Sequence, residues 1–205
     1  MIRVLVAEDM RVLREAMVML LNAEADIDVV EAVESGDEVL SQARVHWPDV
    51  VVLDVGLPGT NGLAVAAQLR KERPELKVLL LTALDKPGVV QEALRIGVHG
   101  FLPKGVSTKH VIEAIRRVHK GNRALNAELV GAAMEAGDNP LSRREQTILQ
   151  RVTNGMTAPM IAREFHLAEG TVRNHITSAI QKLSAHNTID AIRIAERMGW
   201  LDNHS

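Results

Sequence analysis

The first 120 residues alternate short runs rich in Val, Ile and Leu with segments of helical periodicity, and this alternation strongly constrains the fold. Strands are predicted at 2–7, 27–33, 50–53, 77–83 and 100–102. Helices are predicted at 12–21, 36–45, 62–71, 87–96 and, after a cap at Ser107, up to Val118. Strands that alternate with helices predict a parallel sheet covered on both faces. Five such strands favour a doubly wound, flavodoxin-like sheet of order 2-1-3-4-5, with a ligand crevice at the carboxyl ends of the strands.

The second part of the chain has another pattern, because no strand-like run follows Pro140. Ser142, with Glu145 three residues later, has the spacing of a capping box at the start of a helix, and Thr157 is expected to cap the next helix. The expected helices cover 141–155, 157–167, 169–185 and 188–200. We therefore predict an α/β domain at 1–120, a partly helical linker at 121–139 with its helix near 126–136, and an all-α four-helix domain at 140–205.

The composition is that of an ordinary globular protein and excludes several kinds of site. Hydrophobic residues make up 46 %, charged residues 24 % and aromatic residues 2 %, which predicts an aliphatic core. Cysteine is absent, so neither disulfides nor thiolate metal sites are possible, as suits a reducing compartment. No apolar run is long enough for a membrane helix, and the first acids come too early for a signal peptide, so we expect a cytoplasmic protein. The net charge is -2, yet residues 140–205 carry eight Lys and Arg against six Asp and Glu, which suits a polyanionic partner.

Polar side chains follow the predicted strands of the first domain. Glu8 and Asp9 follow the first strand, Asp54 ends the third, Thr82 ends the fourth and Lys104 follows the fifth. Since the carboxyl ends of parallel strands lie along one edge of the sheet, these side chains are expected to converge. Three carboxylates in one pocket repel one another unless a cation lies among them. Mg²⁺ is the natural partner, because it prefers oxygen ligands and needs few carboxylates.

A magnesium ion beside a free carboxylate predicts phosphoryl transfer. Asp54 would be the nucleophile, Lys104 would balance the charge of the phosphoryl oxygens, and the Thr82 hydroxyl would bond the transferred group. The alternative for Asp54 alone is that it caps the Gly-Leu-Pro-Gly turn that follows it. The acids, the threonine and the lysine in register favour the chemical interpretation.

The segments "VAED", "VVLDVGLPGTNG", "LLLTA" and "GFLPKG" resemble the receiver domain of two-component response regulators over about residues 1–120. The resemblance implies that Mg²⁺ is held by Asp9, Asp54 and the backbone carbonyl of Gly56, with Glu8 completing the acidic pair. It also implies that Thr82 and Phe101 form the pair of switch residues that responds to phosphorylation. Many receivers have Pro after the lysine, whereas Gly105 stands here, so a cis peptide is not implied.

The motifs "LSRRE", "NGMT", "IAREF", "EGTVRNHI" and "KL" resemble the LuxR-type helix-turn-helix of the NarL/FixJ response regulators over about residues 141–200. The resemblance and the outward positions of the 169–183 helix indicate that this helix reads DNA. Val172 either meets a thymine methyl group or packs inward, and Ile176 is expected in the core. The candidate DNA-binding residues are Thr171, Val172, Arg173, Asn174, His175, Thr177, Lys182 and Arg143, with Arg144 and Arg163 as weaker candidates.

Two segments depart from the usual pattern of these regulators. Ala158, Pro159 and Met160 stand where the family usually has Asn-Lys-Glu, which removes a lysine that contacts the DNA backbone. Thr188 stands where arginine is usual, at the start of the helix through which these DNA-binding domains often dimerise. The short motifs "TVRN", "NAEL" and "MGW" resemble one subfamily of these regulators, a likeness that does not identify the target genes.

Together these features predict a transcription factor controlled by phosphorylation. A histidine kinase would phosphorylate Asp54, and the resulting homodimer would bind paired half-sites in double-stranded promoter DNA. One alternative is a phosphohydrolase with an aspartate nucleophile, but such enzymes want a second acid where Gly56 stands. Another is a constitutive DNA binder whose first domain serves for dimerisation. A nucleotide-binding fold is disfavoured, because "VAEDMRVLRE" lacks a glycine-rich turn.

Overall fold

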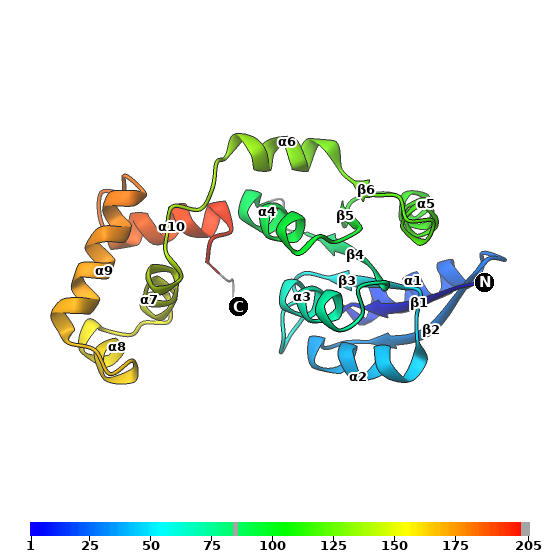
Figure 1. The fold of residues 1–205 in the computed structure, drawn as a ribbon, viewed down its shortest axis with the longest axis horizontal. Coiled ribbons are helices and arrows are strands. Elements are labelled where there is room, and N and C mark those ends of the chain that lie inside the picture. Colours follow the sequence, from blue (N-terminus) through cyan, green and yellow to red (C-terminus); the bar gives the residue numbers. More distant parts are fainter. Residues whose placement is uncertain (84–85, 202–205) are drawn as a thin grey trace. The chain divides into compact units, whose positions relative to one another are not determined.

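The computed structural model describes residues 1–83 and 86–201 (Figure 1). Its strands are β1 (Ile2–Ala7), β2 (Ile27–Val33), β3 (Val50–Asp54), β4 (Lys77–Thr82), β5 (Gly100–Pro103) and β6 (Ala124–Leu125). Its helices are α1 (Arg11–Asn22), α2 (Gly36–His46), α3 (Gly62–Glu72), α4 (Pro87–Ile96), α5 (Thr108–His119), α6 (Ala127–Glu135), α7 (Arg143–Thr153), α8 (Ala158–Glu164), α9 (Glu169–Lys182) and α10 (Thr188–Met198). Residues 1–83 and 89–131 form one compact unit, and residues 132–201 form most of a second.

The first unit is a parallel sheet with the strand order β2-β1-β3-β4-β5-β6. The doubly wound order predicted for the first five strands is confirmed. The expectation of five strands is corrected by β6, in which Ala124 pairs with Gly100 and Leu125 with Phe101. A strand of two residues is too short to show a periodic pattern, but its backbone covers the edge of β5 that would otherwise be open.

Apolar packing fixes the sheet between its helices. The central strands β1, β3 and β4 are buried almost throughout, as their continuous apolar sequences predict. On one face, Met17 and Leu21 of α1 and Ile112 and Ile115 of α5 pack against strand residues in a single aliphatic core. Helices α2 and α3 contact each other and pack on other parts of the sheet. The aliphatic core therefore leaves the carboxyl ends of the strands to carry the polar residues.

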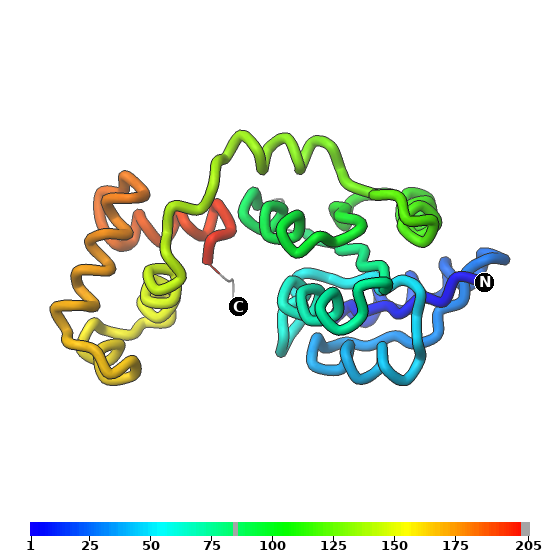
Figure 2. The backbone as a smooth tube through the Cα atoms, in the orientation of Figure 1, coloured from blue at the N-terminus to red at the C-terminus, as the bar shows by residue number. Residues whose placement is uncertain are grey.

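The second unit consists mainly of the short helices α7 to α10, which follow one another along the chain (Figure 2). The capping box at the start of α7 is confirmed, because Ser142 and Glu145 bond each other's backbone amides. Thr157 occupies the N-cap position of α8, but its side chain makes no capping hydrogen bond. Pro159, at the second helical position, lacks one of the amides that such a cap would use.

The segment between the two predicted domains contains both β6 and α6. The helix expected near 126–136 is present as α6, and Asn126 accepts a hydrogen bond from the Leu129 amide at its start. In the part of the chain that the structure describes, no helix has the length and apolar character needed to cross a membrane.

Candidate metal centre and nucleic-acid interface

Three carboxylates lie together at the carboxyl ends of β1 and β3. Ala7 is the register partner of Leu53, so Glu8 and Asp9, which follow β1, lie beside Asp54 at the end of β3. Each of the three acids offers an oxygen within 4.8 Å of the others. Glu8 and Asp54 are buried, at 1 % and 5 % exposure, whereas Asp9 is exposed. The structure therefore forms a notch with one solvent-facing acid and two buried acids, and we call it the acidic notch.

Lys104 lies in the acidic notch with its ammonium group between two carboxylates. Its Nζ is 2.8 Å from Glu8 Oε2 and 2.9 Å from Asp54 Oδ2. The Lys104 amide donates to the Thr82 carbonyl at 2.7 Å, which ties the turn after β5 to the end of β4. The parallel strand ends and this backbone hydrogen bond together place Lys104 beside the acids, although Glu8 and Lys104 are 96 positions apart in sequence.

The charges in the acidic notch are not balanced. Burial raises the pKa of Glu8 and the repulsion of Asp54 adds to this, while the hydrogen bond from Lys104 opposes both. Burial lowers the pKa of Lys104, but hydrogen bonds to Glu8 and Asp54 outweigh it and the net shift is upward. Lys104 thus stays protonated, and three carboxylates face one ammonium group. The excess negative charge and the all-oxygen donor set fit a hard divalent cation such as Mg²⁺.

The turn after β3 also approaches the notch. A Cβ atom at Gly56 would lie 3.5 Å from Asp54 Oδ2, so the glycine backbone borders the carboxylate. A Cβ atom at Gly62 would lie 2.0 Å from the Asp54 carbonyl oxygen, so only glycine lets α3 begin so close to that backbone. Gly62 therefore allows the chain to turn tightly around Asp54, whereas the space at Gly56 does not itself require glycine.

The two expected switch residues lie in the neighbouring strands. Thr82 is the last residue of β4 and is 2 % exposed, and its strand partner is Pro103. Phe101 is 1 % exposed in β5, between Leu80 and Leu125 in the register of the sheet. The structure thus brings Thr82 to the edge that carries the acidic notch and places Phe101 inside the sheet. All peptide bonds of the described residues are trans, including the one before Gly105.

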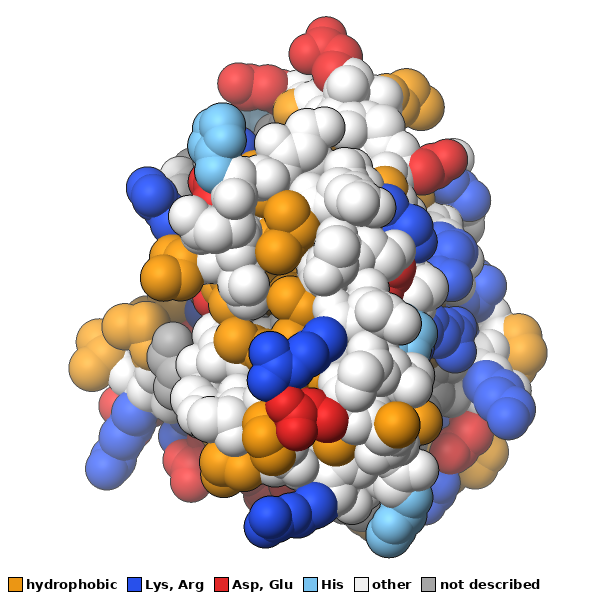
Figure 3. Space-filling model, turned by 90° about the vertical axis from the view of Figure 1, so that its left-hand side faces the viewer, with side chains coloured by type: hydrophobic (Ala, Val, Ile, Leu, Met, Phe, Trp, Pro, Cys, Tyr) orange, Lys and Arg blue, Asp and Glu red, His pale blue; other side chains and the backbone are white. Residues whose placement is uncertain are grey.

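Helix α9 presents most of the predicted DNA-binding side chains. Arg173, Asn174 and Thr177 are exposed, and Thr171 and His175 are partly exposed. In Figure 3, Lys and Arg side chains lie among polar, acidic and apolar ones, and several gather along the right-hand margin of the view. Because Arg173 is joined by the polar Asn174 and Thr177, the exposed side of α9 offers groups suited to base edges.

Val172 is not part of that surface. It is 0 % exposed and packs with Ile148, Ile161 and Ala162 in the core between α7, α8 and α9. The prediction of a DNA contact for Val172 is therefore wrong, because its side chain lies on the inner side of α9 and packs that helix against α7 and α8. Ile176, one turn later, packs partly buried against the same core, as expected.

The predicted basic contacts differ in their surroundings. Arg173 donates from Nε to Glu169 Oε1 at 3.0 Å on the surface of α9. The Arg144 guanidinium lies 4.5 Å from the centroid of the Phe165 ring, so it contributes to packing. Arg143 and Arg163 are exposed.

Lys182 is held by a buried acid that sequence reasoning assigned to helix capping alone. Glu145 is 3 % exposed and accepts hydrogen bonds from the Ser142 amide at 2.6 Å, Ser178 Oγ at 2.7 Å and Lys182 Nζ at 2.8 Å. Burial raises the pKa of Glu145, but these donors outweigh it and lower the pKa to about 2. The carboxylate therefore joins α7 to α9. No sequence signal linked Glu145 to Ser178 and Lys182, which are more than 30 positions away.

Comparisons with known proteins agree with the geometry. The family described as response regulator receiver domain matches residues 4–116, and the luxR family of bacterial regulatory proteins matches residues 139–195. The chain belongs to the response regulators with a receiver domain and a LuxR-type DNA-binding domain. The NarL/FixJ resemblance is confirmed, and the carboxylates of the acidic notch therefore belong to the receiver.

Relatives match this chain over nearly its whole length and theirs. The uncharacterized transcriptional regulatory protein YvfU of Bacillus subtilis is 40 % identical over 98 % of this chain and 100 % of its own length. The transcriptional regulatory protein DesR of the same organism, the subfamily likeness expected from the sequence, is 35 % identical over 98 % of this chain and 99 % of its own. The crystal structure of the response regulator ChrA is 28 % identical, with a TM-score of 0.58 over 98 % of each chain.

Membership in this family decides between two of the alternatives raised by the sequence. Both family matches and the full-length relatives indicate a transcriptional regulator, so the phosphohydrolase alternative is set aside. The two family matches account for most of the chain, and the segment between them contains β6 and α6.

Proposed function

We propose that this response regulator is activated by transfer of a phosphoryl group from a histidine kinase to Asp54. In this reaction an Asp54 carboxylate oxygen forms a bond to phosphorus while the bond from phosphorus to the donor nitrogen breaks, and the nitrogen is then protonated by water. The observation that carries the proposal is the meeting of Glu8, Asp9 and Asp54 with Lys104 at the strand ends of a receiver.

The side chains of the acidic notch have distinct roles in this proposal. Mg²⁺, when bound by Asp9, Asp54 and the Gly56 carbonyl with Glu8 alongside, would neutralise charge on the phosphoryl oxygens. Lys104 keeps a fixed positive charge 2.9 Å from the accepting carboxylate. Thr82, at the end of β4, would bond the new phosphoryl group, and Phe101 would respond within the sheet. Such a bond favours one conformation and so shifts the population toward it.

Phosphorylation would promote dimerisation and binding to promoter DNA. Thr171, Arg173, Asn174, His175 and Thr177 of α9 would contact bases or phosphates, with Lys182 and Arg143 contacting the backbone. Ile189 on α10 is 72 % exposed, an apolar side chain suited to pairing of two such helices. Two linked domains bind paired half-sites more tightly than one because the second contact becomes intramolecular. Since its proposed target is promoter DNA, the protein would act in the cytoplasm.

The nucleophile is tested by incubating the full chain with Mg²⁺ and a small phosphodonor such as acetyl phosphate. Phosphorylation detected by mass spectrometry and phosphate-affinity gels should be lost in Asp54→Ala. The matched control is Asp49→Asn. Asp49 stands just before β3, at the end of the strand opposite to Asp54. Phosphorylation of the Asp54→Ala protein at an unchanged rate would contradict the assignment.

The regulatory step is tested with a beryllofluoride mimic of the phosphoryl group. Light scattering should show a monomer becoming a dimer, and promoter footprinting should require the mimic. Equal promoter affinity with and without beryllofluoride would instead support constitutive DNA binding.

A further inference from the structure

The loop between β1 and α1 carries two acids of the notch but lacks the usual means of holding a helix start. Met10 is the N-cap residue of α1, it makes no side-chain capping hydrogen bond, and the first turn has no acidic residue. The Met10 amide instead donates to Glu8 Oε1 at 3.2 Å. The Glu8 amide donates to the Val33 carbonyl at 3.1 Å, and a further group is needed to hold the Glu8 and Asp9 carbonyls that follow.

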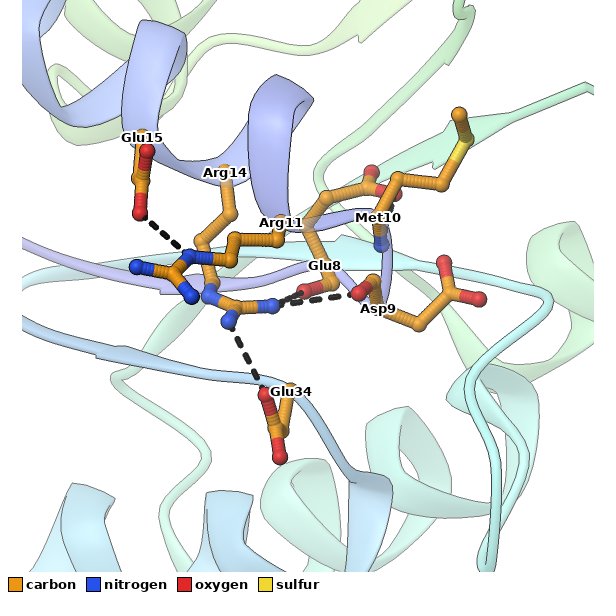
Figure 4. A network of polar contacts seen from close by, with 7 residues as sticks. All are labelled: Glu8, Asp9, Met10, Arg11, Arg14, Glu15 and Glu34. Carbon is orange, nitrogen blue, oxygen red and sulfur yellow. Dashed lines mark hydrogen bonds and ion pairs between the residues drawn. The ribbon is translucent and has the colours of Figure 1, made fainter.

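Arg14 supplies that group from the second turn of α1 (Figure 4). Its Nη1 donates to the carbonyl oxygens of Glu8 at 2.7 Å and Asp9 at 3.2 Å, and its Nη2 donates to Glu34 Oε2 at 2.9 Å. The arginine side chain is 14 % exposed, whereas Glu34, just after β2, is 70 % exposed. The guanidinium group thus ties the loop after β1 to the end of the neighbouring strand.

We propose that Arg14 is a positioning residue for the magnesium site, because it holds the loop in the conformation that presents the Asp9 and Glu8 carboxylates to the ion. This inference rests on the proposed function of the acidic notch. In Figure 4 the carbonyl oxygens of Glu8 and Asp9 face Arg14, while the Asp9 carboxylate points away from it. Arg14 therefore occupies the backbone acceptors and leaves the Asp9 carboxylate for a ligand, while the Glu8 carboxylate beside it bonds Lys104 and the Met10 amide.

The geometry of Arg14 matters as well as its charge. A planar guanidinium directs its donors toward two carbonyl groups and a carboxylate at once, which a compact ammonium group on a flexible stem does less well. A loop that is already ordered loses less conformational entropy when the ion binds. Partners that orient metal ligands in this way commonly change metal affinity by about 10- to 100-fold when they are removed.

Arg11 provides a matched control on the same helix. It also pairs with a glutamate, Glu15 at 2.7 Å, but its side chain is 81 % exposed and none of its hydrogen bonds reaches the described β1–α1 loop. Substituting Arg11 removes the same charge from α1 without releasing the Glu8 and Asp9 carbonyls. A difference between the two substitutions therefore measures the contact and not the charge of the helix.

The test is calorimetric titration of the full chain with MgCl₂ alone. Arg14→Met should raise the Kd for Mg²⁺ by about tenfold or more, Arg14→Lys should raise it less, and Arg11→Met should leave it unchanged. Asp9→Asn serves as the variant that loses a proposed ligand. In acetyl phosphate reactions, the Mg²⁺ concentration for half-maximal phosphorylation of Arg14→Met should rise by the same factor, with the rate at saturating Mg²⁺ retained.

The failure of this inference differs from that of the proposed function. If the wild-type chain and Asp9→Asn bind Mg²⁺ equally, or neither binds it, the magnesium site itself is wrong. If wild type binds it and folded Arg14→Met, verified by circular dichroism, binds it equally well, the inference on Arg14 is overturned. Should Arg14→Met not fold, Glu34→Gln releases the outer end of the guanidinium, and an unchanged Kd in that variant overturns the inference too.

Discussion

Two buried glutamates in this protein each meet a lysine at 2.8 Å, yet their pKa values shift in opposite directions. Glu8 in the receiver has a raised pKa, whereas Glu145 in the DNA-binding domain has its pKa lowered to about 2. Both side chains are almost fully buried, at 1 % and 4 % exposure. Burial and a lysine partner therefore do not determine the behaviour of a carboxylate by themselves.

The difference lies in the other neighbours of each carboxylate. Glu145 accepts hydrogen bonds from Ser142, Ser178 and Lys182, and these donors favour its charged form. At Glu8, burial raises the pKa most, the hydrogen bond from Lys104 that opposes it comes from a lysine shared with Asp54, and the charge of Asp54 adds to the rise. The first arrangement is electrostatically complete and joins two helices. The second has an excess of negative charge, which is destabilising without a cation and suits a binding site.

The largest expected effect is that of Glu145→Gln on the DNA-binding domain. The substitution removes the charge that pairs with Lys182 and one of the acceptors used by Ser142 and Ser178, at a cost of about 3 kcal/mol in the free energy of unfolding. Urea unfolding can be followed by Trp200 fluorescence in a Trp47→Phe background, because the chain has two tryptophans. Gln146→Glu does not serve as a control. The control is Gln150→Glu, at a partly exposed position of α7, which should lower the free energy of unfolding much less than Glu145→Gln. A loss below about 0.5 kcal/mol would mean that the network adds little.

Lowering the pH should remove the stabilising contribution of Glu145 in a range set by its lowered pKa. Because the folded-state pKa of Glu145 is about 2 and lies below the usual value of 4.5, its stabilisation is present above pH 4.5 and decreases as pH falls toward 2. Between those limits wild type should lose about 2 kcal/mol more than Glu145→Gln, measured by urea unfolding with the same tryptophan probe. Parallel pH profiles for the two proteins would show that another group causes the acid sensitivity.

Glu8→Gln should stabilise the receiver, whereas Glu145→Gln should destabilise the DNA-binding domain. Without Mg²⁺ the substitution removes a repelling charge and leaves Lys104 to Asp54, so the free energy of unfolding should rise by about 1 kcal/mol. Trp47 fluorescence in a Trp200→Phe background reports this unit during urea unfolding. Added Mg²⁺ should stabilise wild type more than Glu8→Gln, since ligand binding to the folded state raises its stability. A large loss of stability in Glu8→Gln without Mg²⁺ would mean that Glu8 stabilises the fold as Glu145 does, and would contradict the difference drawn between the two glutamates.

The sequence was sufficient to predict the residues that gather through topology. Glu8, Asp54 and Lys104 each stand at or just after the end of a strand, and a parallel sheet brings such ends to one edge whatever the details of packing. The sixth strand could not be predicted in this way, because two residues carry no period. Its formation depends on the backbone of β5 being open at its edge.

Side-chain direction and contacts between distant residues were harder to predict. Periodicity left two orientations for Val172, and the packing of three helices decides that it faces inward. Arg14 has no pattern that marks it, since its partners are backbone carbonyls whose directions depend on the folded loop. Lys182 was assigned to DNA by position in a helix, whereas its partner Glu145 comes from another helix.

The smallest expected effect concerns how Lys182 contributes to DNA binding. Each phosphate contact by a free cation changes the slope of log K against log salt by about 0.9. Arg143 is exposed and makes no ion pair among the described residues, so Arg143→Gln should reduce the slope by nearly that amount if it contacts a phosphate. Lys182→Gln should reduce it less, because Glu145 already pairs with the ammonium group. Fluorescence anisotropy with a nonspecific duplex at several salt concentrations measures both slopes. Equal reductions would mean that Lys182 leaves Glu145 on binding, and the buried carboxylate would then resemble Glu8 in lending its partner to a ligand.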